Sequence, residues 1–465
     1  MEINLVKFIL ALIFFLFSSI AGAQVHEFVL KNGLKLLVKE DDRAPIVVSQ
    51  IWYKVGSSYE TDGTTGVSHV LEHMMFQGTR KHGEGEFSRI IAENGGSENA
   101  FTGSDYTAYF QTLEKSRLPI SFELEADRMR NITLPQEAFE KEIEVVKEER
   151  RLRTDDNPNS YLREVANATA FQTSPYRQPI IGWMADLASM DVADLRSWYK
   201  KWYAPNNATL VVVGDIEADD VYKLARKYFG RLKGEVALPP SHRPEVEQQG
   251  IKRVIVKRPA EIARLTMAYK TPALKSALQD NSSVEKWEPY ALEMLSGILS
   301  GGSSARFASR LVRGEEVATG VNSSYNLAGR LDGLFVISAT PAQGKSIEEL
   351  EQAIRAQINE LKSSEVAEEE LQRVKAQVVS SDVYEKDSAF YQGMILGTFE
   401  TVGLGWEYAE EYVEQISAIT AEQVQEVTKK YLNDNVATIA VLEPISMDRE
   451  SSGQGAVLPG ANSNE

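Results

Sequence analysis

The spacing of apolar residues near the start of the chain predicts strands followed by a helix. Residues 27–41 alternate on both sides of Asn32-Gly33, a pair typical of a tight β-hairpin turn. Residues 46–57 are largely apolar and predict a longer strand. Residues 66–78 then carry apolar side chains at helical spacing between two glycines. The pattern indicates a mixed α+β domain.

The same mixture continues to a proline-rich break. Residues 85–93 predict a short helix, and residues 97–114 alternate and are rich in Thr, Tyr and Phe, as strands are. A strand at 207–216 and a helix at 219–232 are expected to close the domain. Residues 234–249 lose periodicity and gather prolines, which predicts a linker.

The order of elements then repeats. Residues 251–271 resemble the opening strands, and residues 290–313 take the place of the helix at 66–78. Helices near 346–363 and 365–387 precede a final strand at 435–444. We therefore expect an α+β fold of two homologous domains, each a mostly antiparallel sheet with helices packed on one side.

The two ends of the chain differ from this pattern. Lys7, an apolar run over residues 8–17 and the sequence Ala21-Gly22-Ala23 predict a secretory signal peptide at 1–23. An uncleaved anchor is the alternative, but the apolar run is short for a membrane span. The expected boundaries are 24–233 for the first domain, 250–446 for the second and 447–465 for a disordered tail. We expect export to a bacterial periplasm, with no stable membrane anchor.

Composition removes several classes of function. The chain has 0 cysteines, which excludes disulfides, a cysteine nucleophile and Cys-ligated zinc. A formal net charge of −17 argues against nucleic acid as a partner.

The candidate chemistry lies in the helix expected at 66–78. His69 and His73 are at positions i and i+4, so they rise from one helical face and can hold one metal ion. Zinc suits imidazole and carboxylate ligands in a site that leaves a position for water. Glu72 shares that face and can act as a general base. Two solvated histidines are the alternative, but the flanking residues are apolar and the chain holds only 5 histidines.

A third ligand is expected from the long, charged helix at residues 136–156. Its acidic stripe includes Glu142 and Glu149, seven residues apart. The helix pattern alone does not choose among Glu142, Glu148 and Glu149. A solvated, charge-rich helix is the competing interpretation.

Three segments closely resemble the pitrilysin/insulinase family of zinc metallopeptidases, in its shorter bacterial and mitochondrial-processing-type branch. They are HVLEH at 69–73, GGSENAFTGSDYTAYF at 95–110 and EKEIEVVKEERRLRTDDNP at 140–158. The resemblance places the third ligand about 76 residues after the second histidine, which selects Glu149. It also implies that Glu142 orients a metal ligand.

The resemblance further implies a clamshell in which the two domains face each other across a chamber. One zinc ion per chain, an endopeptidase activity and peptide or unfolded polypeptide substrates follow from it. The residues matching the segment from Ser97 to Thr102 form an edge strand that pairs with the substrate backbone. The expected substrate-binding residues are Ser97, Asn99, Ala100, Phe101, Thr102 and Arg313.

One departure from the family pattern affects the second domain. Complete relatives carry an arginine and a tyrosine there that reach the substrate. Arg313 matches the arginine, but the tyrosine position falls on Thr319, and Tyr325 lies six residues further on. We therefore expect the zinc-bearing subunit of a two-chain peptidase whose homologous partner supplies the Arg/Tyr pair. A noncatalytic scaffold subunit and a zinc-binding protein without hydrolysis are the alternatives.

Overall fold

The computed structural model describes residues 24–234 and 244–446. The signal peptide expected at 1–23, the tail expected at 447–465 and most of the proline-rich linker lie outside the described residues. Within the described part, no helix is long and apolar enough to cross a membrane.

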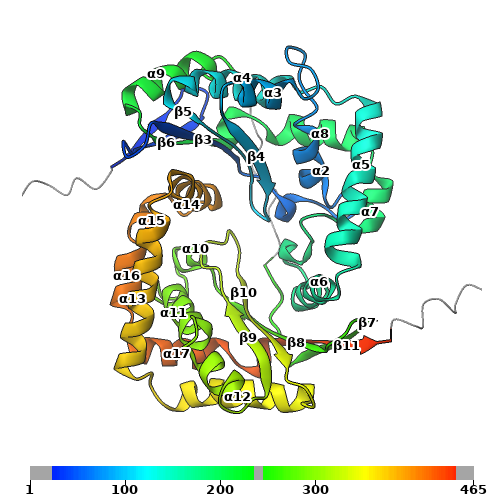
Figure 1. Cartoon of the computed structure of the whole chain (residues 1–465), viewed down its shortest axis with the longest axis vertical. Helices are drawn as coiled ribbons and strands as arrows, with labels where there is room; N and C mark the ends of the chain where they lie inside the picture. The colour runs from blue at the N-terminus through cyan, green and yellow to red at the C-terminus, as the bar shows by residue number, and fades with distance from the viewer. Residues whose placement is uncertain (1–23, 235–243, 447–465) are drawn as a thin grey trace, which may run out of the picture.

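The first half of the chain forms one six-stranded sheet (Figure 1). Its strand order is β1-β2-β6-β3-β5-β4, and every neighbouring pair is antiparallel except β2 with β6. The strands are β1 (Val25–Val29), β2 (Lys35–Glu40), β3 (Ile46–Tyr53), β4 (Ser97–Thr102), β5 (Thr107–Glu114) and β6 (Ala208–Gly214).

Helices of the first half pack one face of this sheet into an apolar core. Leu36, Ile51, Tyr109 and Leu210 belong to that core, as do Val70 and Phe122 from the helices. The helices are α2 (Val67–Met74), α3 (Glu86–Glu93), α4 (Leu118–Asn131), α5 (Gln136–Arg150), α6 (Pro158–Ala170), α7 (Met184–Ser189), α8 (Val192–Trp202) and α9 (Ala218–Tyr228).

The second half forms a five-stranded sheet in the order β7-β11-β8-β10-β9, with only β7 and β11 parallel. Its strands are β7 (Lys252–Pro259), β8 (Arg264–Thr271), β9 (Ala318–Ser324), β10 (Gly333–Pro341) and β11 (Ala437–Ile445). Its helices are α10 (Leu274–Ala277), α11 (Glu288–Ser300), α12 (Ile347–Ser363), α13 (Glu368–Glu385), α14 (Ala389–Val402), α15 (Glu407–Glu410), α16 (Tyr412–Ala418) and α17 (Ala421–Tyr431).

The two sheets repeat one topology. Strands β7, β11, β8, β10 and β9 correspond in order and direction to β2, β6, β3, β5 and β4, and each sheet has its one parallel pair at the same place. By the same chain order α11 corresponds to α2, α12 to α4, α13 to α5 and α14 to α6. The expected α+β fold of two similar domains is confirmed, and Figure 1 shows the two halves facing each other.

One helix from each half packs on the sheet of the other half. Helix α14 lies on the face of the first sheet opposite its own helices, where Leu396 packs with Trp52 and Val211. A Cβ at Gly397 would lie 2.1 Å from Cε2 of Trp52, so glycine is required for this close approach. In return α6 packs on the second sheet, where Leu162 belongs to the same apolar cluster as Leu442 (Figure 1).

The sequence-based elements agree with the structure in kind and differ at their ends. The hairpin turn lies at Asn32-Gly33, where Gly33 has φ +88°. The helix expected over 136–156 is α5 followed by a π-helical segment, Arg151–Asp155. The helices α4, α6, α7 and α8, and those from α14 to α17, were not predicted. Two of them, α8 and α17, begin with capping boxes at Asp191 and Thr420, a signal that could have indicated them.

Candidate metal centre

Helix α2 is held at its start by a buried carboxylate. Gly66 precedes the helix with φ +88°, and a Cβ there would lie 2.6 Å from the carbonyl oxygen of Ile181. Glu60 accepts hydrogen bonds from the backbone N–H groups of Gly66 (2.6 Å) and Ser68 (2.8 Å). These are N–H groups that the helix itself leaves without partners. Glu60 therefore holds the first turn of α2 in place up to Ser68, the residue before His69.

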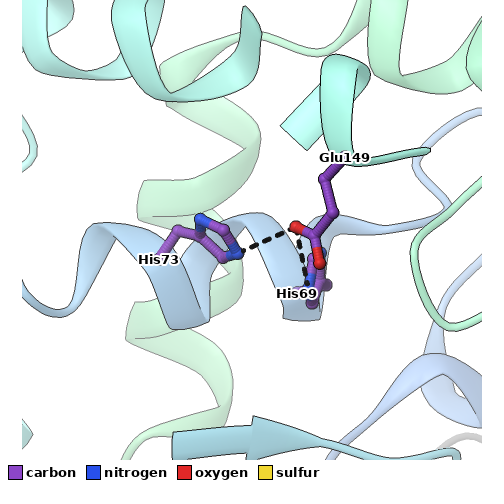
Figure 2. A group of neighbouring side chains, drawn as sticks. All are labelled: His69, His73 and Glu149. Carbon is purple, nitrogen blue, oxygen red and sulfur yellow. Dashed lines mark ion pairs between the residues drawn. The ribbon is translucent and has the colours of Figure 1, made fainter. Parts of the chain in front are cut away.

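The structure brings His69, His73 and Glu149 together (Figure 2). Oε2 of Glu149 lies 3.8 Å from Nε2 of His69 and 3.4 Å from Nε2 of His73. One ligand atom from each of the three side chains lies within 4.8 Å of the other two. In Figure 2 both imidazoles rise from α2 toward the carboxylate that descends from the end of α5.

The three candidate glutamates of the long helix have different surroundings. Glu148 is exposed and pairs with Arg151 at 2.8 Å. Glu142 points instead to the far side of an imidazole, where its Oε1 lies 2.8 Å from Nδ1 of His73. Only Glu149 faces both histidines, so the geometry separates the three residues that the helix pattern left equivalent.

Glu142 therefore contacts the ring nitrogen of His73 that faces away from Glu149. Its second oxygen accepts a hydrogen bond from Nε2 of Gln77 at 3.3 Å. A carboxylate on one ring nitrogen orients the imidazole and favours the tautomer whose other nitrogen is free to bind metal. His69 has no such support, since its Nδ1 is buried without a hydrogen-bond partner among the described residues.

Glu72 lies on the same helix between the two histidines and is contacted from the edge strand. Oγ1 of Thr102, the last residue of β4, donates a hydrogen bond to Oε2 of Glu72. Burial raises the pKa of Glu72, and the hydrogen bond from Thr102 opposes that rise. A carboxyl group with a raised pKa in a partly buried site is suited to proton transfer near neutral pH.

The pKa values of the two imidazoles are shifted in opposite directions. Burial, together with the neighbouring His73 and Arg153, lowers the pKa of His69 to about 3. Burial also acts to lower the pKa of His73, but the hydrogen bond to Glu142 and the charges of nearby carboxylates outweigh it and raise that pKa. His69 is thus a neutral imidazole over the physiological pH range, as a metal ligand must be.

Sequence reasoning missed one charged group at the cluster. Arg153 lies in the π-helical segment after α5 and forms an ion pair with Oε1 of Glu149 at 2.5 Å. The oxygen that faces the histidines is the other one, Oε2. Short π-helical segments are frequently found at functional sites, but a sequence pattern does not distinguish them from ordinary helix.

The donor set fits zinc. Ligand atoms about 2.1 Å from a tetrahedral zinc ion lie roughly 3.4 Å from one another, close to the 3.4 and 3.8 Å measured between Glu149 and the two histidines. Two imidazole nitrogens and one carboxylate are the ligands of several catalytic zinc sites, which keep a fourth position open. In one respect the cluster differs from such sites. They usually give the second ring nitrogen of each histidine a hydrogen-bond partner, whereas Nδ1 of His69 has none among the described residues.

Strand β4 lies at the edge of the first sheet, beside α2, as expected for the segment 97–102. Within the described sheet β4 is hydrogen-bonded to β5 alone, so its outer edge has no partner strand. Phe101 packs edge-on against Trp52 with ring centroids 5.4 Å apart, on the face away from Thr102. The expected substrate-binding residues Ser97, Asn99 and Ala100 lie along the same strand.

The residues expected from the second half do not join this cluster. Arg313 is exposed and donates a hydrogen bond to the backbone oxygen of Ser303 at 2.7 Å, within its own half. Thr319 is exposed on β9. The hydroxyl of Tyr325 donates to the backbone oxygen of Pro272 at 2.6 Å. Among the described residues, none of these three forms a hydrogen bond or ion pair with the His-Glu cluster.

Family models cover most of the chain. Residues 35–183 match the model described as "Insulinase (Peptidase family M16)", and residues 189–378 match "Peptidase M16 inactive domain". The chain is 31% identical over 428 residues to "Zinc protease PqqE" of Helicobacter pylori, covering 90% of this chain and 93% of that protein.

Solved structures agree with this relationship. A protease from Helicobacter pylori superposes with a TM-score of 0.85 at 28% identity, over 91% of this chain and 100% of that one. The periplasmic protease PqqL of Escherichia coli shares the fold, with a TM-score of 0.75 at 19% identity, over 95% of this chain but only 52% of that one. The fold and the His-Glu cluster are similar in kind to those expected of zinc proteases. The chain belongs to the insulinase family of peptidases.

Proposed function

We propose that this protein is a zinc-dependent endopeptidase that hydrolyses peptides or unfolded protein segments. The observation that carries the proposal is the convergence of three ligand atoms from His69, His73 and Glu149 within 4.8 Å of one another, with Glu72 on the same helix. The relatives named as zinc proteases support the same chemistry.

The side chains of the cluster have separate roles in this reaction. A zinc ion held by His69, His73 and Glu149 would act as a Lewis acid that polarises the scissile carbonyl and lowers the pKa of a water molecule. Glu72 accepts the proton of the attacking water and returns it to the leaving amine. Thr102 holds the Glu72 carboxylate through its hydroxyl, and Glu142 fixes the ring of His73.

The substrate binds as an added strand. The unpaired edge of β4 offers backbone groups to an extended polypeptide, from Ser97 to Thr102. Because Thr102 also contacts Glu72, a strand bound there passes beside the general base. A folded protein has few exposed extended segments, so this mode favours peptides and unfolded chains.

A partner subunit and a periplasmic location belong to the same proposal. Thr319 stands where the family pattern expects a tyrosine, and Tyr325 uses its hydroxyl within its own half. PqqL is about twice as long as the part that this chain matches, so in that protein the matched fold is joined to a further segment of similar length. We propose that a homologous chain supplies an arginine and a tyrosine, and that residues 1–23 direct export to the periplasm.

The decisive experiment measures hydrolysis and metal in the same samples. Purified mature protein is incubated with a library of quenched fluorescent peptides, and zinc is quantified per chain, for the wild type and for Glu72→Gln. Glu148→Gln is the matched control, because Glu148 is an exposed carboxylate next to a ligand position. We expect about one zinc per chain in all three proteins, with hydrolysis lost only in Glu72→Gln.

Each other outcome identifies an alternative. Zinc without hydrolysis in the wild type would favour a missing partner subunit, and adding the homologous chain should then restore activity. Zinc without hydrolysis even with that partner would favour a scaffold or zinc-binding role. Absence of bound zinc would overturn the proposal.

A further inference from the structure

A cavity of about 1040 Å³ lies in the second half, between α11, α13 and α14 and beside the end of β9. Helices α11 and α13 and strand β9 correspond to α2, α5 and β4 of the first half, by the shared topology. The cavity therefore occupies the place that the His-Glu cluster occupies in the first half. The sequence has no histidine after His242, so this place requires a different chemistry.

One end of the cavity is acidic and aromatic. Glu293 of α11 lies there, and its Oε1 accepts a hydrogen bond from the hydroxyl of Tyr412 at 2.8 Å. The side chains of Tyr325 and Tyr391 line the same cavity. Asp382 and Glu385 of α13 line the same cavity as Glu293. Carboxylates among aromatic rings form a favourable environment for an organic cation.

Acidic residues at this end are only partly neutralised within the protein. Lys386 forms an ion pair with Asp382 at 2.8 Å. Tyr391 and Tyr412 are hydrogen-bond donors to Glu385 and Glu293, but hydroxyl groups do not cancel a charge. Burial raises the pKa of Glu293 to about 7, which is the response of a carboxyl group that lacks a cationic partner.

A half-buried cation, Arg373, lines the cavity nearer the start of α13. Nη2 of Arg373 is buried and forms no hydrogen bond among the described residues, and Nη1 reaches only Oε1 of Gln377 at 3.3 Å. Val374 contacts Gly297, one turn beyond Glu293, since a Cβ at Gly297 would lie 2.5 Å from Cγ1 of Val374. Residues 373 and 382 are separated along α13 by on the order of 13 Å.

We infer that this cavity binds a small zwitterion, an amino acid or short peptide with free termini, whose ammonium group faces Glu293 and whose carboxylate faces Arg373. Guanidinium groups pair with carboxylates through two parallel hydrogen bonds, which accounts for a buried Nη2 without a partner. Phe399, Ile395 and Val378 supply apolar walls between the two ends for the body of the ligand.

The dimensions favour a peptide over a single amino acid. An extended chain advances about 3.3 Å per residue, so a tripeptide spans roughly 10 Å, comparable with the spacing of about 13 Å between Arg373 and Asp382 along α13. The site is separate from the metal centre and lies within the other half of the chain. It therefore does not depend on hydrolysis at His69 and His73.

The test is isothermal titration calorimetry on the full chain after removal of metal with a chelator. The probes are the tripeptide Ala-Leu-Ala, its N-acetylated form, its C-amidated form, and free leucine and lysine. We expect acetylation and amidation each to weaken binding by about tenfold or more, the loss of one charged contact. Because these changes are made on the ligand, they leave the folding of the protein untouched.

Variants assign each terminus to one residue. In Glu293→Gln the free and acetylated peptides should bind alike, and in Arg373→Gln the free and amidated peptides should bind alike. Glu369→Gln, an exposed residue at the start of α13, is the matched control and should bind as the wild type does. Circular dichroism checks that the variants are folded.

The outcomes separate the possible ligands. Tighter binding of the tripeptide identifies peptides as the ligand, whereas equal binding of free leucine or lysine identifies amino acids, and both support the zwitterion site. Lack of binding at millimolar concentrations, or binding that ignores both termini and both variants, would overturn it. Since the protein is metal-free, failure here leaves the proposed peptidase activity standing, and the converse also holds.

Discussion

Nδ1 of His73 and Oε1 of Glu142 lie 2.8 Å apart, while Nε2 of the same ring faces Glu149 at 3.4 Å. A single imidazole thus connects a carboxylate that orients it with the site where a metal would bind. Helix α5 supplies both carboxylates, two turns apart. The spacing of Glu142 and Glu149 therefore sets the orientation of His73 as well as completing the cluster.

Replacing Glu142 should weaken zinc binding without abolishing it. In Glu142→Gln the ring of His73 loses its charged acceptor, so we expect zinc affinity to fall about 10- to 100-fold. A competition titration with a chromophoric chelator measures the change. Glu140→Gln, an exposed position on the same helix, is the control and should bind zinc as the wild type does. Equal affinities in both variants would contradict the role of Glu142.

Replacing Glu60 should loosen the start of α2. The variant Glu60→Gln removes one of two acceptors for the N–H groups of Gly66 and Ser68 and turns an NH₂ group toward them. Leaving one buried donor unsatisfied costs about 1–3 kcal/mol. Urea unfolding of the metal-free protein should show this loss, and zinc affinity should fall with it. Glu84→Gln, at an exposed position, should change neither quantity.

The raised pKa of Glu293 predicts a particular dependence of stability on pH. Burial raises its pKa to about 7 from an ordinary value of 4.5, so the folded state holds this proton more tightly than the unfolded state. Its contribution to stability is complete below pH 4.5 and is lost as the pH rises through 7. The pH-dependent loss of stability is at most on the order of 3 kcal/mol. It disappears in Glu293→Gln, because glutamine does not ionise.

The measurement is the melting temperature of the wild type and of Glu293→Gln at pH 5 and pH 8. We expect the variant to gain relative to the wild type as the pH rises. Glu369→Gln should follow the wild type at both values. A difference between wild type and Glu293→Gln that does not change with pH would show that the carboxyl group titrates normally.

Arg330 should be important for holding the two halves together. This residue of the second half forms an ion pair with Asp105 at 3.1 Å and donates to Oγ of Ser58 at 2.8 Å. Asp105 and Arg330 are both largely buried, so Arg330→Met leaves a carboxylate without its cation. Breaking a buried pair in this way costs about 3–5 kcal/mol. Thermal unfolding measures it, with the exposed Arg163→Met as control.

The sequence predicts the members of the His-Glu cluster better than their surroundings. The positions of His69, Glu72 and His73 follow from helical spacing alone. Glu149 does not, because Glu142 and Glu148 satisfy the same pattern, and the family resemblance was needed to choose it. The structure then gives Glu142 and Glu148 different neighbours.

Contacts between distant segments could not be predicted in this way. The hydrogen bond from Thr102 to Glu72 joins a strand to a helix thirty residues earlier, and alternation in the strand does not indicate which side chain meets which partner. The role of Glu60 depends on a turn that brings its carboxylate back to Gly66. Arg330 and Asp105 lie in different halves, so no local pattern connects them.

The exchange of α6 and α14 between the two sheets has a consequence for how the chain can be divided. A fragment that ends at residue 234 would lack α14 and would expose Trp52 and its neighbours to water. The complementary fragment would lack α6 and would expose Leu442. We therefore expect that neither fragment folds as a self-contained unit. Two separately expressed halves should instead assemble with each other, as two subunits do when each completes the core of the other.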